Sequence, residues 1–129
     1  MTSVHSIDSV EYEAQDGVGV WTITDFAAYV QSDDLEAGEQ HYREEASAES
    51  MRATVVVINN AEALGSEMSD TLDHINEEWS QLADDVGIER LAYVADGMMA
   101  NAVKVNIDAD IEIDSFNSVD DAVEWCQQV

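Results

Sequence analysis

The run Ala53–Asn59, which reads Ala-Thr-Val-Val-Val-Ile-Asn, constrains the fold of this chain more than any other segment. It is the most apolar β-branched stretch in the sequence, and its apolar residues do not alternate with polar ones. Such a pattern is typical of a central strand that is covered on both faces, as strands of parallel sheets are. We therefore expect an α/β fold in which other elements pack on both sides of this strand.

A long amphipathic helix is predicted after this strand. Ser66 is its expected N-cap, and Gly87 is its expected end, because glycine accepts the left-handed conformation that closes many helices. Apolar residues at intervals of three and four predict one buried stripe over about five turns. The stripe consists of Met68, Leu72, Ile75, Trp79, Leu82 and Val86.

Turn residues and apolar spacing predict the remaining elements. An Asp-Gly pair at 16–17 between two β-rich runs is typical of a hairpin, and Asp25 is placed to cap a helix. The helix over 33–47 has a thin apolar stripe, so we expect it on the outside of the protein. In chain order we expect strands at 6–12 and 18–24, helices at 26–30 and 33–47, a strand at 53–59, a helix at 68–86, a strand at 90–95, a helix at 98–105, a strand at 109–116 and a helix after Ser118.

This order predicts an α/β protein with a mixed sheet of about five strands. The opening hairpin is antiparallel, and the following βαβαβα order implies parallel pairing with helices packed on the sheet. The last helix is expected to line its inner face with Val119, Ala122, Val123 and Cys126. Because the chain has no proline and no serine- or glycine-rich linker, we expect residues 1–129 to form a single domain.

The charge of the chain predicts the environment in which the protein functions. It has 29 acidic and four basic residues, a net charge of -25, yet 46% of its residues are hydrophobic, which is enough for a core. The acidic residues are spread evenly, with 12 in residues 1–50, 10 in 51–100 and seven in 101–129. An even coat of this kind suits near-molar salt, which screens the repulsion, so we expect a cytoplasmic protein of a halophile such as a haloarchaeon.

Other classes of partner and location are disfavoured by the same composition. Four scattered basic residues make nucleic acid and anionic lipid poor partners. No apolar run approaches the roughly 20 residues of a membrane span. The segment Met1–Glu13 lacks the blocks of a signal peptide, and the single cysteine, Cys126, cannot form an intrachain disulfide.

The second half of the chain resembles a known family. Residues 89–96 read Glu-Arg-Leu-Ala-Tyr-Val-Ala-Asp, and they are followed by Ile111–Phe116 and by Asp121–Trp125. These residues resemble the SpoIIAA-like branch of the STAS superfamily, in which an Arg-x-Ala-x-Val-x-Asp strand precedes a closing Phe-(x)n-Ala-x-x-Trp helix. The resemblance is best over residues 53–129 and implies a STAS-type sheet. For this branch it also implies binding of a small apolar ligand or lipid.

A phosphorylation site is a second implication of the resemblance. Classical STAS anti-sigma-factor antagonists are phosphorylated on a serine of an Asp-Ser-Ser-Gly-like motif where a strand meets the long helix. Ser66 and Ser69 fall near that position, but the preceding aspartate and the following glycine are missing. Helix capping is the structural interpretation of Ser66, and a phospho-switch is the alternative.

Two further sets of residues are candidates for binding. The carboxyl ends of the predicted strands carry Asn59, Asn60, Asp96, Gly97, Met98 and Met99. Ligands of open α/β sheets gather at such ends, so these residues form a candidate pocket for an apolar ligand or a partner, with core packing of the methionines as the alternative. Asp70 and His74, one turn apart, come nearest to a metal site, but we expect a solvated helix face and predict no metal.

These observations predict a non-enzymatic binding or regulatory domain. We expect a monomer or homodimer without a cofactor, which binds a protein partner or a small apolar ligand. A phospho-switch at Ser66 is the alternative. An enzyme of unknown type ranks third, because the sequence has no nucleophile elbow and no phosphate-binding loop after a strand.

Overall fold

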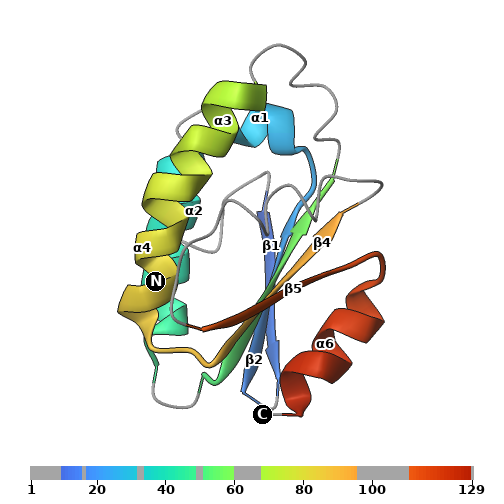
Figure 1. Ribbon diagram of the computed structural model, residues 1–129. Helices are drawn as coiled ribbons and strands as arrows, with labels where there is room; N and C mark the ends of the chain where they lie inside the picture. Colours follow the sequence, from blue (N-terminus) through green and yellow to red (C-terminus); the bar gives the residue numbers. More distant parts are fainter. Residues whose placement is uncertain are drawn as a thin grey trace.

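The computed structural model describes residues 10–15, 17–31, 34–48, 51–59, 68–95 and 111–128. They form one five-stranded sheet with helices on both faces (Figure 1). The elements are β1 (Val10–Gln15), β2 (Val18–Ile23), α1 (Phe26–Val30), α2 (Asp34–Ala46), β3 (Ala53–Ile58), α3 (Met68–His74), the π-helical turn η3 (Ile75–Trp79), α4 (Ser80–Val86), β4 (Arg90–Ala95), β5 (Glu112–Phe116) and α6 (Val119–Gln127).

The sheet has the mixed topology that the sequence predicts. Its strands follow one another in chain order, with β1 antiparallel to β2 and every later pair parallel. Gly17 turns the hairpin at a φ of 82°, a conformation that favours glycine. The predicted first strand ends too early, because β1 continues beyond Tyr12 to Gln15, which pairs with Val18 at the turn. The central strand β3 is buried along its whole length, as expected for a strand covered on both faces.

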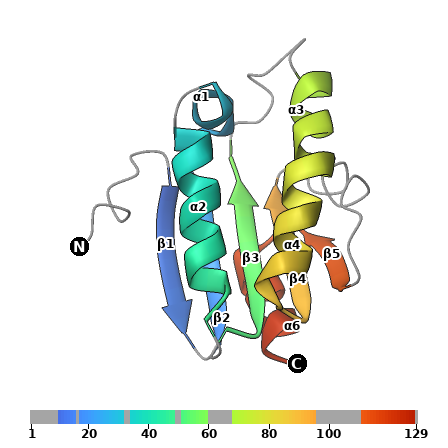
Figure 2. The same ribbon diagram turned by 90° about the vertical axis from the view of Figure 1, so that its left-hand side faces the viewer.

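Helices form a layer on each face of the sheet. Helices α1, α2 and α3–α4 cover one face, where α2 and α3–α4 run side by side (Figure 2). Helix α6 covers the other face, against β2, β3 and β4 (Figure 1). Asp25 caps α1 as predicted, because its Oδ1 accepts a hydrogen bond from the backbone N–H of Ala28 at 3.2 Å.

Helix α2 lies over one face of the sheet with Glu36 and Glu44 exposed, but its inner face is wider than the predicted thin stripe. In α2, His41, Tyr42 and Ala46 are buried. The apolar pattern missed two positions of this face, because they are not occupied by apolar residue types. His41 is buried with its Nδ1 accepting a hydrogen bond from Trp21 Nε1 at 2.9 Å, and Gly38 leaves room for Tyr29, whose Cε1 would lie 2.8 Å from an added Cβ.

The long helix after β3 forms over Met68–Val86, with one irregularity that the apolar spacing does not predict. Its middle turn, Ile75–Trp79, is π-helical, so α3 and α4 are joined by a wider turn. Trp79, Leu82 and Val86 are buried as expected. Gly87 ends the helix in the left-handed conformation, with a φ of 78°.

The second face contains a smaller layer built by α6. Ala122 and Cys126 are buried and Val123 is half-buried, but Val119 is exposed, which corrects the prediction that it lines the inner face. Val119 is the first residue of α6 and borders a surface cleft together with Glu13 and Val20. Burial raises the pKa of the Cys126 thiol to about 12, so the thiol is protonated and acts as a small apolar group.

The expected helix at 98–105 and the expected N-cap Ser66 lie outside the described residues. Ser118 occupies the N-cap position of α6, but its side chain makes no capping hydrogen bond. Within the described parts of the chain, no helix is both long and apolar enough to cross a membrane.

Candidate functional site

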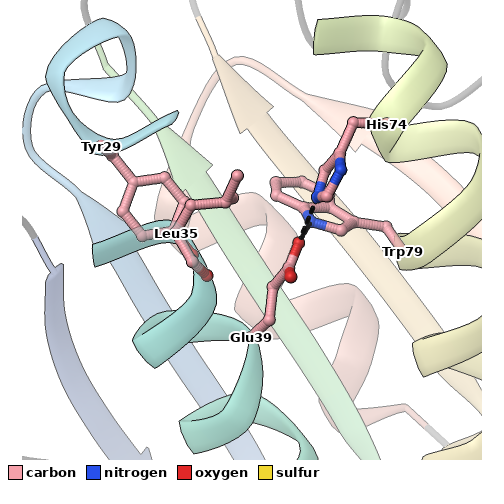
Figure 3. Close-up of polar contacts among 5 residues, drawn as sticks. All are labelled: Tyr29, Leu35, Glu39, His74 and Trp79. Atoms are coloured by element: carbon pink, nitrogen blue, oxygen red, sulfur yellow. Dashed lines mark hydrogen bonds and ion pairs between the residues drawn. The ribbon is translucent and has the colours of Figure 1, made fainter. Parts of the chain in front are cut away.

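A polar cluster joins α2 to the long helix in the middle of the larger layer. Oε2 of Glu39 accepts a hydrogen bond from Nε2 of His74 at 2.7 Å and a second from Nε1 of Trp79 at 2.9 Å (Figure 3). The Glu39 side chain is 17% exposed and the His74 side chain 36% exposed. One carboxylate oxygen therefore receives two N–H donors from the π-helical region, the kind of irregularity that often occurs at functional sites.

Glu39 points toward the long helix α3–α4 because of its position in α2. Leu35, Glu39, Tyr42 and Ala46 recur at intervals of four, three and four, the spacing of an inward stripe. His74 is the last residue of α3 and Trp79 the last of η3. Figure 3 shows the three polar side chains pointing toward one another across the gap between the helices.

A partly open cavity of about 40 Å³ lies beside this cluster, between the helices and the sheet. Apart from Glu39, its lining within the described residues is aromatic or aliphatic, together with Gly38. The aromatic residues of the lining come from five elements: β2, α1, α2, η3 and β4. The lining residues are Val10, Trp21, Ile23, Tyr29, Gly38, Glu39, Tyr42, Val56, Trp79, Leu82, Leu91 and Tyr93.

The aromatic rings of this layer hold one another in fixed positions. Trp79 stacks on Tyr93 with ring centroids 6.0 Å apart, and Phe26 meets Trp79 edge to face at 6.2 Å. The hydroxyl of Tyr42 shares a 2.7 Å hydrogen bond with Oγ1 of Thr54. Burial raises the pKa of Tyr42 and of Tyr93 well above the ordinary value, so both phenols are neutral at physiological pH.

A larger and more open cleft, of about 230 Å³, lies on the outer side of the cluster. Trp79 lines both spaces, while Glu39 lines the inner cavity and His74 the outer cleft. The hydrogen bond between Glu39 and His74 therefore lies at the boundary between them. The remaining residues of the cleft are Val30, Gln31, Leu35, Asp70 and Thr71.

The cleft lies toward the carboxyl ends of the parallel strands, where a site was predicted. In Figure 1, α1 and α3 stand at the end of the sheet to which β3 and β4 point. Of the predicted pocket residues, Asn59 is exposed at the end of β3, where its N–H donates to Ile23 O at 3.1 Å. Asn60, Asp96, Gly97, Met98 and Met99 lie outside the described residues, as does Ser66, and nothing is described of the Ser69 side chain.

Asp70 and His74 are the weak candidates for a metal site. They line the same cleft, but the Nε2 atom of His74 is engaged by Glu39. In the described ranges, no group of three or more His, Cys, Asp or Glu side chains is arranged to hold a metal ion. Glu39 is the residue of the candidate site that sequence reasoning missed. The sequence does contain a signal for it, because a carboxylate at a position of an apolar stripe is unusual.

Comparisons of this chain with models of protein families, with curated proteins and with solved structures find no match. The geometry must therefore be interpreted by itself. The polar side chains that line the two spaces include Glu39 in the inner cavity and Asp70, Thr71 and His74 in the outer cleft. An apolar cavity with one polar group at its edge is typical of sites that bind small molecules.

Proposed function

We propose that this protein is a non-enzymatic binding domain that takes a small, largely apolar ligand between α2 and the helix α3–α4. The observation that carries the proposal is the cavity of about 40 Å³, which is lined mostly by aromatic and aliphatic side chains. Interiors of proteins contain few voids larger than a water molecule. A void of this size costs about 1 kcal/mol of stability, which a ligand group that fills it would restore.

We propose that the ligand enters from the outer cleft, because Trp79 is the wall shared by the two spaces. The polar contact at their boundary is made by side chains that rotate without moving the backbone. The half-exposed His74 is the side chain of this contact that is closest to solvent. A ligand that displaces it would reach the inner cavity.

The resemblance to SpoIIAA-like STAS proteins supports the same function, since it implies binding of small apolar ligands or lipids. A mixed sheet that opens with a hairpin is compatible with that family, and we include membership of it in the proposal. The even acidic coat supports the cytoplasm of a halophile as the place of action.

The test is a binding screen with four small aromatic probes in molar KCl. Phenol, 2-phenylethanol, phenethylammonium and 3-phenylpropionate are titrated while backbone amide NMR signals are followed. We expect at least one probe to shift the signals of Trp21, Tyr42 and Tyr93, which line the cavity. If no probe shifts these signals, the proposal is wrong.

A cavity-filling variant provides the control for the location. Val56→Leu adds one methylene group to the cavity lining and should weaken binding while the melting temperature is kept or raised. The matched variant Val123→Leu makes the same change on α6, on the other face of the sheet, and should bind as the wild type does. Equal binding by Val56→Leu and Val123→Leu would place the ligand elsewhere.

A further inference from the structure

The charge inside the proposed binding site is negative. Glu39 is the one charged side chain among the described residues that line the inner cavity, and it is only 17% exposed. A carboxylate in such surroundings is costly unless polar partners compensate it. Its Oε2 has two N–H partners, whereas Oε1 has no hydrogen-bond partner within the described part of the chain. One acceptor position of a largely buried carboxylate therefore remains for a ligand.

The rings around this carboxylate favour the same sign of ligand charge. Each aromatic face carries the negative end of a ring quadrupole and attracts a cation within about 6 Å. The cavity is lined by five such rings: Trp21, Tyr29, Tyr42, Trp79 and Tyr93. Several rings and one carboxylate around a small space are the elements by which proteins recognise organic ammonium ions.

The outer cleft has no lysine or arginine among the described residues that line it, and it carries a further carboxylate, Asp70. Its one basic side chain, His74, is hydrogen-bonded to Glu39. The whole chain has only four basic residues, and two of them are engaged elsewhere: Arg43 pairs with Asp85, and Arg90 pairs with Glu112. A negatively charged ligand would meet repulsion without a compensating partner.

From these observations we infer that the ligand is an organic ammonium ion. Its ammonium group lies beside Oε1 of Glu39, against the aromatic rings of the inner cavity. Its apolar body occupies the outer cleft, against Val30, Leu35 and Trp79. This inference rests on the proposed function, to which it adds the chemical class of the ligand.

The sizes of the two spaces agree with this orientation. A cavity of about 40 Å³ has room for a few heavy atoms, since one water requires about 10–15 Å³, so a primary or methylated ammonium group fits and a larger ring does not. The cleft of about 230 Å³ has room for the apolar remainder. Glu39 lines the cavity and is hydrogen-bonded to His74, which lines the cleft (Figure 3), so the two parts of the ligand would meet beside its carboxylate.

The experiment compares probes that differ in charge but hardly in shape. Phenethylammonium, 2-phenylethanol and 3-phenylpropionate are titrated against the full chain in molar KCl by isothermal calorimetry, with N-methylphenethylammonium to test methylation. We expect phenethylammonium to bind about tenfold more tightly than the alcohol, and 3-phenylpropionate to bind most weakly. In Glu39→Gln, which keeps the shape and a carbonyl acceptor, the preference for the ammonium probe should disappear.

Glu36→Gln is the matched control, because Glu36 is exposed on the same helix and its loss changes the net charge equally. It should keep the tenfold preference. Equal affinities of the wild type for phenethylammonium and 2-phenylethanol would overturn the inference and leave the proposed function intact. Tighter binding of 3-phenylpropionate would overturn it as well. If no probe binds at all, the proposed function itself fails. The comparison of probes on the wild type does not depend on the folding of any variant.

Discussion

The two faces of the sheet carry cores of different chemistry. The aromatic layer, under α1, α2 and α3–α4, contains the buried rings Trp21, Phe26, Tyr29, Tyr42, Trp79 and Tyr93. The aliphatic layer, under α6, has a core of Val18, Ala53, Val55, Val57, Ala92, Val94, Ala122 and Cys126. Small aliphatic side chains bring no polar atoms that need partners, and they fill space closely. Tyrosine and tryptophan rings carry hydroxyl and N–H groups that need partners. Because the rings are rigid, they do not fill the layer completely, and the cavity remains between them.

The same strands build both layers, because neighbouring residues of a strand point to opposite faces. Val55 belongs to the aliphatic layer and Val56 to the aromatic layer, and Ala92 and Tyr93 divide in the same way. The difference between the layers therefore lies in which residue types occupy alternate positions. It suggests a division of tasks, in which the aliphatic layer stabilises the sheet and the aromatic layer binds.

Removal of salt should have the largest effect, and it should affect both layers together. Exposed carboxylates cover the outer sides of both, for example Glu36 and Glu44 on α2, and Asp120 and Asp121 on α6. As KCl falls from molar to millimolar, screening is lost and the folded state should become much less stable. Far-UV circular dichroism measures the fold, and labelling of Cys126 reports the aliphatic layer. Near-UV dichroism reports mainly the aromatic layer, which contains two of the three tryptophans, Trp21 and Trp79. Full stability in millimolar KCl would refute adaptation to salt, and separate transitions would show that the layers unfold independently.

A pair of matched substitutions tests the division of tasks directly. Val55→Ala and Val56→Ala remove the same atoms from adjacent residues on opposite faces of β3. Each should cost about 2 kcal/mol of unfolding free energy in urea titrations, with the larger loss at Val55, because Val56 already borders a cavity. Only Val56→Ala should change the affinity for the ammonium probe. If Val55→Ala weakens binding as much, the layers do not have separate tasks.

The fold could be predicted from the sequence because its signals are local. The β-branched run at Ala53–Ile58, the three–four spacing up to Val86 and the glycines at turns each report burial or backbone conformation within a few residues. The exceptions have identifiable causes. The π-helical turn at Ile75–Trp79 does not disturb the spacing of apolar residues, and the inner face of α2 includes a histidine and a glycine that an apolar pattern does not count.

The candidate site could not be predicted to the same extent because its contacts are not local. Glu39 lies 35 residues before His74 and 40 before Trp79, and their meeting depends on how α2 lies beside the long helix. The sequence singled out His74 and Trp79 for other reasons. Glu39 alone, a carboxylate between Leu35 and Tyr42 on an inward stripe, could have indicated a polar group facing the core.

Arg90 should be the most important cation of the aliphatic side. Its Nε donates to Glu112 at 2.7 Å, its Nη1 donates to the Trp125 carbonyl at 2.6 Å, and its guanidinium lies 4.8 Å from the centre of the Trp125 ring. One side chain thus ties β4 to β5 and to α6. Arg90→Met should cost about 1–3 kcal/mol in urea titrations and loosen α6, detected as faster labelling of Cys126. Unchanged labelling of Cys126 would show that the packing of Ala122 and Cys126 holds the helix without this arginine.

Arg43 is the counterpart on the aromatic side, and its removal should have the smallest effect. Its Nη1 lies 2.9 Å from Oδ2 of Asp85 and links α2 to α4, the helices that flank the cavity, but the two side chains are 50% and 42% exposed. Water and salt screen such a pair, so Arg43→Met should cost about 0.5 kcal/mol in dilute salt and less in molar KCl. Probe affinity should change less than about twofold, since rings and not this ion pair set the distance between the helices. A larger loss of affinity would mean that the width of the site depends on its charged rim, and the aromatic layer would then not be the rigid frame inferred above.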